Sequence, residues 1–493
     1  MDAYKELLEH YKKYVIINSV SSLLYWDMNI TMPAAANSYR STQMNELSKV
    51  SSEIIKNPKI GELISKAQKL KLDEFQKRNL QLIEESHKLN NAVPTELSSR
   101  MEAQGNTTLQ TWKKAKNKRD FSIVQQELQK NFEVRLEYAQ KIQKVNNADS
   151  LHSALIQIRE PGMSSSTVRK LFAQTREFLV PLIKKVQNAQ QDNPYVTQIP
   201  LKMDRSSQHS LVKRIADLYN YDYSSENNVG RIDEVEHPLT FRLGPNDVRV
   251  SVKYHEKDFT KALFAMHHEL GHAIDSLGLN KEWQYLPVNS RRYPSMGECY
   301  SRFTENKIGK SWEFWRENYL NLNEIMKLKM DAQSFYTSFS TVTPGTSRIG
   351  SDELTYAMHI IIRFELEDLL FSDKLQINEV PQAWNEMYQK YLGVSPKDDT
   401  EGVMQDLHWY SNYWAYFQGY ALGDIFGSQI YYSVPEFDGT NIAEIRQWLS
   451  ENAYSLAGRY PPLETVEKIT GKPVNVKYHK KYLTEKYQSI FEF

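Results

Sequence analysis

The chain has 493 residues, and its 61 basic and 61 acidic side chains give a formal net charge of zero. This balance argues against a general nucleic-acid binder, which would carry a basic excess or a basic stripe. No apolar run approaches the roughly 18 residues of a membrane span, and the low glycine and proline contents, 19 and 18 residues, favour long helices over a β-rich architecture.

The cysteine content and the start of the chain indicate the cellular compartment. Cys299 is the only cysteine, which excludes an internal disulfide and a cysteine-rich zinc site. The opening MDAYKELLEHYKKYV is charged and helix-like, and it lacks the apolar core of a signal peptide. We therefore expect a soluble cytoplasmic protein without a membrane partner.

Residues 1–190 show the spacing of amphipathic helices. In one segment the apolar positions step by three and four residues, which places them on a single helix face: Phe121, Val124, Leu128, Phe132, Leu136 and Ala139. The stretch QDNPYVTQIP, 191–200, is typical of a loop between two parts of a fold. We expect one domain over 1–493, with a helical lobe over 1–190 and a second, catalytic lobe over 200–493.

The hydrophobic period changes at DVRVSVKY, 247–254. Val248, Val250 and Val252 alternate with polar residues, which predicts a strand with one buried face. An exposed edge of this strand would allow an extended peptide to hydrogen-bond along 247–252. Loops are expected at three further places: STVTPGTSRIGSD (340–352), SPKDDTEG (395–402) and PEFDGT (435–440).

The segment HHELGHAID, 267–275, carries the strongest chemical signal in the chain. On a helix, His268 and His272 differ by about 40° in direction, so both imidazoles can reach one metal ion. Glu269 can reach a water at that ion and act as general base. The apolar residues lie on the opposite side, where they can pack inward, and a glycine marks the helix end: Met266, Leu270, Ile274, Leu277 and Gly278.

A hydrolytic zinc site usually has a third protein ligand and an open position for water. Spacing leaves two candidates, Glu298 and Glu305, and favours Glu298, which stands 26 residues after His272. In a competing interpretation, Ser295 and Glu298 form a capping box that only caps their own helix.

Three other polar residues near this motif receive structural interpretations. His267 has glycine at the i+4 position and therefore no helical co-ligand. Asp275 could orient a ligand histidine, but a solvated charge at the helix end is the favoured interpretation. Cys299 adjoins a candidate ligand and has no dedicated histidine and asparagine to activate it, so we expect no nucleophilic role.

Seven blocks across most of the chain, in this order, resemble those of the carboxypeptidase Taq family of HExxH metallocarboxypeptidases, a gluzincin-type family. They are LLYWDMNITMPAAANSYRSTQMNELS (23–48), His237-Pro238-Leu239, Asp247-Val248-Arg249-Val250-Ser251, the HHELGH helix, Gly297-Glu298-Cys299-Tyr300 with Ser347-Arg348-Ile349-Gly350-Ser351-Asp352, and the complete G-x-x-Q-D-x-H-W motif at Gly402, Gln405, Asp406, His408 and Trp409. The departures from the family pattern are Leu239, Ser251, Cys299, Tyr300, Ser347 and Ser351.

The resemblance implies a mainly α, neurolysin-like and zincin-like fold, with two helical lobes flanking a deep active-site cleft and a small sheet beside the metal helix. It also implies Glu298 as third ligand, one divalent cation per chain and a homodimer. Zn²⁺ is the expected ion, and Co²⁺ or Mn²⁺ is compatible with a site of two histidines and one glutamate.

The resemblance further suggests roles for residues outside the metal helix. His408 and Tyr420, with Tyr416 as the alternative phenol, are expected to stabilise the oxyanion. Arg348, and after it Arg249, is expected to bind the substrate's C-terminal carboxylate through paired hydrogen bonds. In a structural interpretation, Arg249 pairs with Asp247 instead. The expected substrate-binding set is Arg348, Arg249, His237, Asp247, Gln405 and Tyr416.

The function expected from these observations is that of a metallocarboxypeptidase of broad specificity. A metal-activated water would release single C-terminal amino acids from peptides. A related helical oligopeptidase or dipeptidyl carboxypeptidase shares the HExxH and glutamate set and is the alternative enzyme. A peptide-binding scaffold with a relic motif is the non-catalytic alternative.

Overall fold

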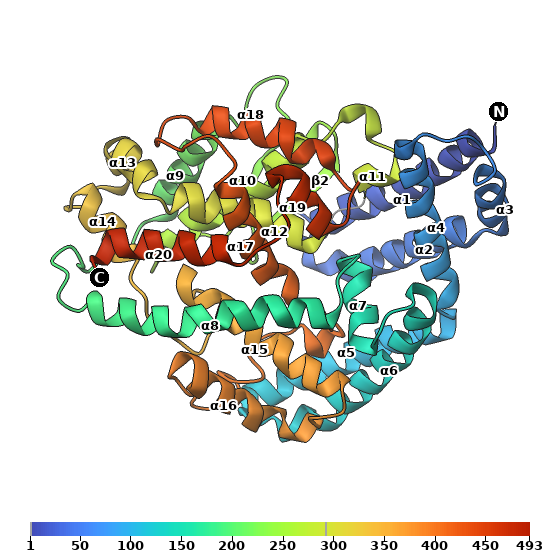
Figure 1. The fold of residues 1–493 in the computed structure, drawn as a ribbon, viewed down its shortest axis with the longest axis horizontal. Helices are drawn as coiled ribbons and strands as arrows, with labels where there is room; N and C mark the ends of the chain where they lie inside the picture. The colour runs from blue at the N-terminus through green and yellow to red at the C-terminus, as the bar shows by residue number, and fades with distance from the viewer. Residues whose placement is uncertain (1, 291–292) are drawn as a thin grey trace.

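Long amphipathic helices make up most of the computed structural model, which describes residues 2–290 and 293–493 (Figure 1). The helices in chain order are α1 (Ala3–Ile30), η1 (Ala34–Ala36), α2 (Asn37–Lys56), α3 (Pro58–Ala67), α4 (Glu74–Ala92), α5 (Thr95–Lys118), α6 (Ser122–Asn146), α7 (Leu151–Arg159), α8 (Ser165–Ala189), α9 (Arg205–Leu218), α10 (Phe259–Leu277), η2 (Lys281–Trp283), α11 (Pro287–Ser290), α12 (Pro294–Arg302), the π-helix η3 (Phe303–Gly309), α13 (Trp312–Met326), α14 (Ala332–Phe339), α15 (Glu353–Phe371), η4 (Ile377–Glu379), α16 (Val380–Leu392), η5 (Trp409–Ser411), α17 (Gln418–Tyr431), α18 (Ile442–Asn452), η6 (Tyr454–Leu456), α19 (Pro462–Thr470) and α20 (Lys477–Phe491). The mainly helical fold class is confirmed.

The helices form where local sequence signals predict them. Side chains at several N-caps accept a hydrogen bond from the first turn, which satisfies one of the amides left free there: Asp2, Asn57, Asp73, Ser150, Ser164 and Asp204. Most of the predicted apolar stripe of α6 is buried, with Val124 and Leu128 fully excluded from solvent and Leu136 partly buried. The four predicted loops lie between helices, at 191–200, 340–352, 395–402 and 435–440.

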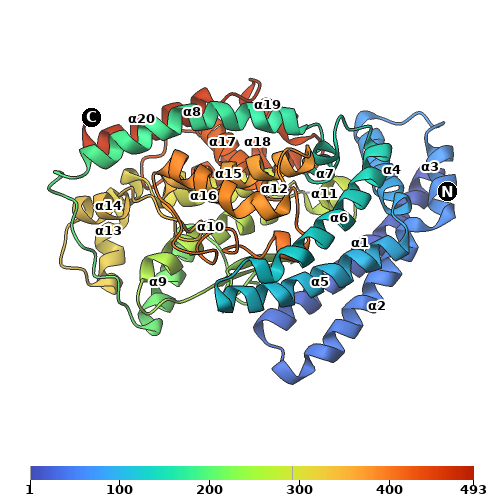
Figure 2. The same ribbon diagram turned by 90° about the horizontal axis from the view of Figure 1, so that it is seen from below.

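Buried apolar residues of the described chain form three hydrophobic clusters, one of which is a small group of Val93, Leu97, Ile142, Ala148 and Ala154. Helices α1, α3 and α4, with the end of α2, enclose a second cluster, and α1 and α2 run as an antiparallel pair at one edge (Figure 2). The main core extends from Ala115 on α5 to Phe491 on α20 and includes α6 and α8. The lobe boundary near residue 190 and the deep cleft between lobes stay predictions. None of the described helices is both long and apolar enough to cross a membrane.

A three-stranded sheet lies beside the metal helix. Strands β1 (Ile232–Glu234) and β2 (Leu239–Gly244) flank β3 (Asp247–Val252), in the order β1-β3-β2. The predicted strand is therefore present as β3, with its three valines fully buried. Its predicted open edge is wrong, because β3 pairs with a neighbour on both sides. The free edge next to α10 belongs to β2.

Glycines let the ligand-bearing helix α12 lie against two neighbours at backbone contact. A Cβ atom on Gly271 of α10 would lie 2.6 Å from Ser301 Cα, and one on Gly423 of α17 would lie 2.8 Å from Cys299 N. Both distances are shorter than real contacts allow. Only glycine at these positions permits helices α10, α12 and α17 to approach this closely. This approach brings Glu298 of α12 to the HExxH residues of α10.

We expect Gly423→Ala to destabilise the fold by about 1–3 kcal/mol, because the new methyl group would overlap the backbone of residues 298–299. Denaturant-induced unfolding measures this loss. Gly345→Ala is the matched control, since a Cβ there meets nothing within 4 Å. Equal unfolding free energies for the two variants would contradict the close-contact role of Gly423.

Candidate active site

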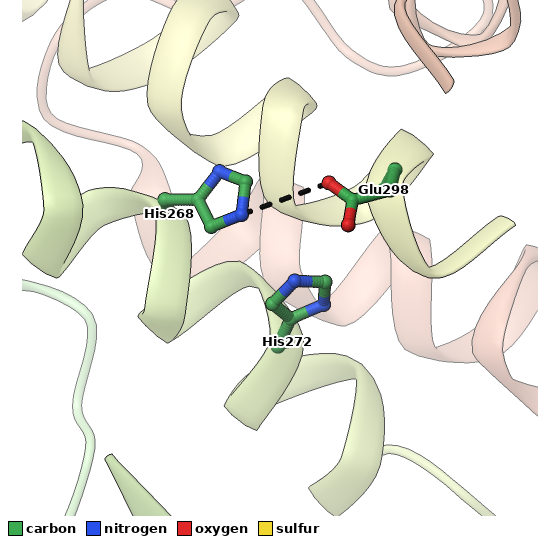
Figure 3. Close-up of side chains that lie close together, drawn as sticks. All are labelled: His268, His272 and Glu298. Atoms are coloured by element: carbon green, nitrogen blue, oxygen red, sulfur yellow. Dashed lines mark ion pairs between the residues drawn. The ribbon is translucent and has the colours of Figure 1, made fainter. Parts of the chain in front are cut away.

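Two imidazoles and one carboxylate converge between α10 and α12 (Figure 3). The ligand atoms of His268, His272 and Glu298 all lie within 4.8 Å of one another, and His268 Nε2 stands 3.7 Å from Glu298 Oε2. The two rings are 5.0 Å apart between centroids and nearly perpendicular. His268 and Glu298 keep 22% and 17% of their side-chain surface exposed, so the group is reachable from solvent.

This arrangement fits a divalent cation. Two ligand atoms on one tetrahedral zinc ion lie roughly 3.4 Å apart, close to the separation of the His268 and Glu298 atoms. Two imidazoles and a carboxylate are a known hydrolytic donor set that leaves one position for water. Among the residues that the structure describes, no other group of three or more histidine, cysteine, aspartate or glutamate side chains has this geometry.

Glu305, the other candidate ligand, contacts the opposite nitrogen of His268. His268 Nδ1–H donates to Glu305 Oε2 at 3.0 Å. The π-helix η3 presents this carboxylate, and Arg302 Nη1 and Lys310 Nζ hold it at 3.1 Å and 2.6 Å. Glu305 is therefore placed to orient a ligand rather than to bind the ion, a common role for carboxylates behind metal-binding histidines.

The charges around His268 also shift its pKa. Burial alone would lower that pKa, but the Glu305 hydrogen bond and the Glu298 charge outweigh it and raise the value to about 9. Burial raises the pKa of Glu298, and the cations Lys310 and Arg302 keep the pKa of Glu305 well below its usual range despite its burial.

Glu269 is buried beside the sheet, where Thr240 of β2 fixes its carboxylate. The Thr240 hydroxyl lies 2.7 Å from Glu269 Oε2, to which it donates, and 2.9 Å from the Glu269 carbonyl. Burial raises the pKa of Glu269 to about 7, which suits a group that takes up and releases a proton near neutrality. The sequence did not single out Thr240, which directly follows the His237-Pro238-Leu239 block.

The N-terminus of α12 is capped by a residue from another part of the chain. Glu160, at the end of α7, accepts hydrogen bonds from Ser295 N and Ser295 Oγ at 2.8 Å and 2.5 Å. The helix N-cap is Tyr293, which makes no side-chain cap. The predicted Ser295–Glu298 capping box is therefore wrong, because Ser295 bonds to Glu160 and Glu298 faces the histidines.

A buried ion-pair group centres on Asp406. Arg348 Nη2 and Arg363 Nη2 lie 2.9 Å and 2.6 Å from its two oxygens. Gln405 fixes the Arg348 loop, since its side-chain oxygen accepts from Arg348 N at 3.0 Å and its amide donates to the Thr346 carbonyl at 2.8 Å. The Arg348 guanidinium lies 5.5 Å from the Tyr420 ring centre.

His408, Tyr416 and Tyr420 form an aromatic group next to Arg348. The His408 ring packs 4.5 Å from Phe417 and 5.4 Å from Tyr416, and the Tyr416 and Tyr420 rings lie 5.8 Å apart. Burial lowers the pKa of His408 to about 4 and raises that of Tyr420 well above its usual value. Both groups are therefore uncharged near neutral pH.

Residues on other helices hold the loop that carries this aromatic group. Glu367 of α15 accepts from Trp409 Nε1 at 2.5 Å and from Ala415 N at 3.0 Å. Arg135 of α6 donates to Asn412 Oδ1 at 2.8 Å. These contacts tie α6, from the first third of the chain, and α15 to the candidate site, and no local sequence signal marked them.

The remaining candidates lie on or beside the sheet. Arg249 makes a two-pronged ion pair with Asp247, at 2.8 Å for both contacts, and stacks on Trp26 of α1 at 4.2 Å. The structure thus brings Arg249 and Asp247 together with each other rather than with the histidines. His237 is exposed in the turn between β1 and β2.

Of the three residues for which the sequence favoured a structural interpretation, His267 and Cys299 are buried in the core, whereas Asp275 differs from its expected exposure. His267 is fully buried and bonds to Tyr219 Oη at 2.8 Å. Burial raises the pKa of the fully buried Cys299 thiol, which agrees with an inert side chain. The expectation of a solvated Asp275 is wrong, because this residue is only 3% exposed.

Comparisons with known proteins identify the family that the chain resembles over its whole length. The family model of carboxypeptidase Taq (M32) metallopeptidases matches residues 6–487. Carboxypeptidase 1 of Bacillus subtilis is 29% identical over 99% of this chain and 98% of the relative. The M32 carboxypeptidase structure from Deinococcus radiodurans superposes with a TM-score of 0.93 at 26% identity and full coverage of both chains. Metallocarboxypeptidase 1 of Trypanosoma cruzi gives 0.93 at 27% identity and 99% coverage of both.

We expect Glu305→Gln to raise the Kd for Zn²⁺ by about 10- to 100-fold, because His268 loses its charged hydrogen-bond partner. Competition with a chromophoric chelator measures this Kd. Glu353→Gln is the matched control, since Glu353 is also buried and paired with lysines but does not contact His268. An unchanged Kd in Glu305→Gln would show that Glu305 does not support the ligand.

Proposed function

Because the chain belongs to the carboxypeptidase Taq (M32) family and is a metal-dependent carboxypeptidase, we propose that His268, His272 and Glu298 hold its divalent cation. We propose Zn²⁺ as the ion, with Co²⁺ or Mn²⁺ able to occupy the same donors. The observation that carries this proposal is the approach of the three ligand atoms to within 4.8 Å of one another.

Glu269 is the proposed general base. When bound, the cation supplies a Lewis acid that polarises the scissile carbonyl and activates the attacking water. Glu269 takes the proton of that water and passes it to the leaving amine. The Thr240 hydroxyl holds the carboxylate of Glu269 in place, and burial gives this group a pKa of about 7, suited to both transfers.

Tyr420 and His408 are the proposed donors to the developing oxyanion. Both are uncharged near neutral pH, so each can donate an O–H or N–H hydrogen without placing a full charge in the site. Tyr416, 5.8 Å from Tyr420 between ring centres, is the alternative phenol.

Arg348 is the proposed receptor for the substrate's terminal carboxylate. Its guanidinium is 12% exposed, close to Tyr420, and held by Asp406. Arg348 and Arg363 together carry two positive charges and Asp406 carries one negative charge. This group therefore has a net positive charge, which favours an incoming carboxylate. Arg249, Asp247, His237 and Gln405 are proposed as further substrate-binding or supporting residues.

The proposed substrates are peptides with a free C-terminus, from which single residues are released with broad specificity. The protein is proposed to act in the cytoplasm as a homodimer without a nucleic-acid partner. The single buried thiol and the balanced charge support this setting. A ladder of peptide products, read by mass spectrometry, tests the reaction: dipeptide or internal cuts would support the oligopeptidase alternative.

We expect Glu269→Gln to lower kcat by about 10²- to 10⁴-fold, because the amide cannot take up the water's proton. Metal content should stay at one ion per chain, since Glu269 is not a proposed ligand. Hydrolysis of a blocked dipeptide, together with metal analysis, measures both quantities. Near-normal turnover in this variant would remove Glu269 from the mechanism.

We expect Arg348→Ala to lower kcat/KM for peptides with a free C-terminus by about 10- to 100-fold, the cost of losing hydrogen bonds between charged groups. Arg348→Lys keeps the positive charge but loses the two-pronged geometry, so its kcat/KM should lie between those of the wild type and Arg348→Ala. The same peptides with an amidated C-terminus are the control. An equal loss on free and amidated peptides would refute carboxylate binding by Arg348.

A further inference from the structure

The hydrogen-bonding pattern of the sheet shows which residues line the free edge of β2. Val248 N and Val250 N donate to carbonyls on the β1 side, at 2.9 Å and 3.0 Å. Backbone groups of alternate residues point to opposite sides of a strand, so Arg249 faces β2, where it pairs with Phe241. By the same alternation, the backbone groups of Thr240 and Arg242 point away from β3, along the open edge.

Arg242 is a largely enclosed cation without a counter-ion. Its Nε atom is buried and has no hydrogen-bond partner, and no ion pair joins Arg242 to any acid within residues 2–290 and 293–493. Burial lowers its pKa, with no acid near enough to offset the effect. By contrast, Arg249 is paired with Asp247 and Arg348 with Asp406. A partly desolvated charge of this kind costs free energy until an anion joins it.

Arg242 lies next to the catalytic machinery on the same face of the sheet. Thr240 and Arg242 pair with Val250 and Val248, the buried face of β3 that packs on α10. Thr240 contacts Glu269 and so marks the level of the scissile bond. Arg242 follows two residues later, roughly 7 Å along the strand.

We propose that Arg242 selects peptides with an acidic side chain two or three residues before the scissile bond. The proposal rests on the proposed carboxypeptidase function and on a substrate that pairs with the edge of β2. A carboxypeptidase substrate has only one residue beyond the scissile bond, so a partner two residues along the strand falls on its N-terminal side. The substrate residue that lies opposite Arg242 would point its side chain to the same face of the sheet, toward α10, where it would contact the Arg242 guanidinium.

Blocked pentapeptides with a free C-terminus test this proposal. In each pair, one peptide carries glutamate and the other glutamine at the second or third position before the scissile bond. We expect wild type to favour glutamate by about 10-fold in kcat/KM at one of these positions, equivalent to a partly screened ion pair. The preference should appear mainly in KM.

Substitutions at position 242 separate a direct contact from a structural role. Arg242→Gln should abolish the preference for glutamate while leaving the glutamine peptides unchanged within about 2-fold. Arg242→Glu should reverse the charge preference, so that a peptide with lysine at the same position is cleaved better than the glutamate peptide. A purely structural arginine would not give this result. Arg231→Gln is the control, because Arg231 directly precedes β1, on the far side of β3 from Arg242, is paired with Asp233, and should not alter the ratio.

The outcomes distinguish this proposal from the function on which it rests. Wild-type protein that releases no C-terminal residue would overturn the proposed function itself. Wild-type protein that cleaves both members of each pair equally would overturn only the role of Arg242. A loss in Arg242→Gln that is equal for all peptides, and absent with amidated C-termini, would instead assign Arg242 to the terminal carboxylate and also overturn the proposal.

Discussion

The active site depends on how closely helix α12 can lie between α10 and α17. The proposed third ligand, Glu298, comes from a different helix than the histidines, so it reaches them only if the helices meet at backbone contact. Gly271 and Gly423 provide that contact, since a side chain at either position would overlap α12. Glu160 fixes the start of α12, and η3 continues it toward His268. A small error in any of these contacts would separate the ligands.

The sequence was sufficient to predict the helical part of the site and insufficient for contacts between elements. The spacing of His268 and His272 follows from helix geometry alone. The choice between Glu298 and Glu305 could not follow from spacing, because both carboxylates reach His268, one at each ring nitrogen. The three-dimensional path of α12 and η3 places Glu298 beside both histidines and Glu305 at the opposite nitrogen of His268, and this is why we propose Glu298 as the ligand.

The sheet illustrates the same limit. The alternating valines predicted β3 correctly, because burial of one face leaves a period of two in the sequence. The neighbours β1 and β2 are short and less regular, so nothing in the sequence indicated that β3 would lie in the middle. The position of a strand within a sheet is a property of its partners. Thr240 of β2, which donates a hydrogen bond to the proposed general base Glu269, was missed for this reason.

The π-helical form of η3 constrains how this enzyme can vary in chain length. Within η3, Glu305 meets His268 seven positions after Glu298, and neighbouring cations hold it there. Loss of Phe303 or Thr304, which precede Glu305 in this segment, would turn the Glu305 side chain by about 100° relative to α12. Such a deletion touches neither a ligand nor a catalytic group, yet it would withdraw the support behind the first histidine. Tolerance to insertion and deletion should therefore be lowest between Arg302 and Lys310.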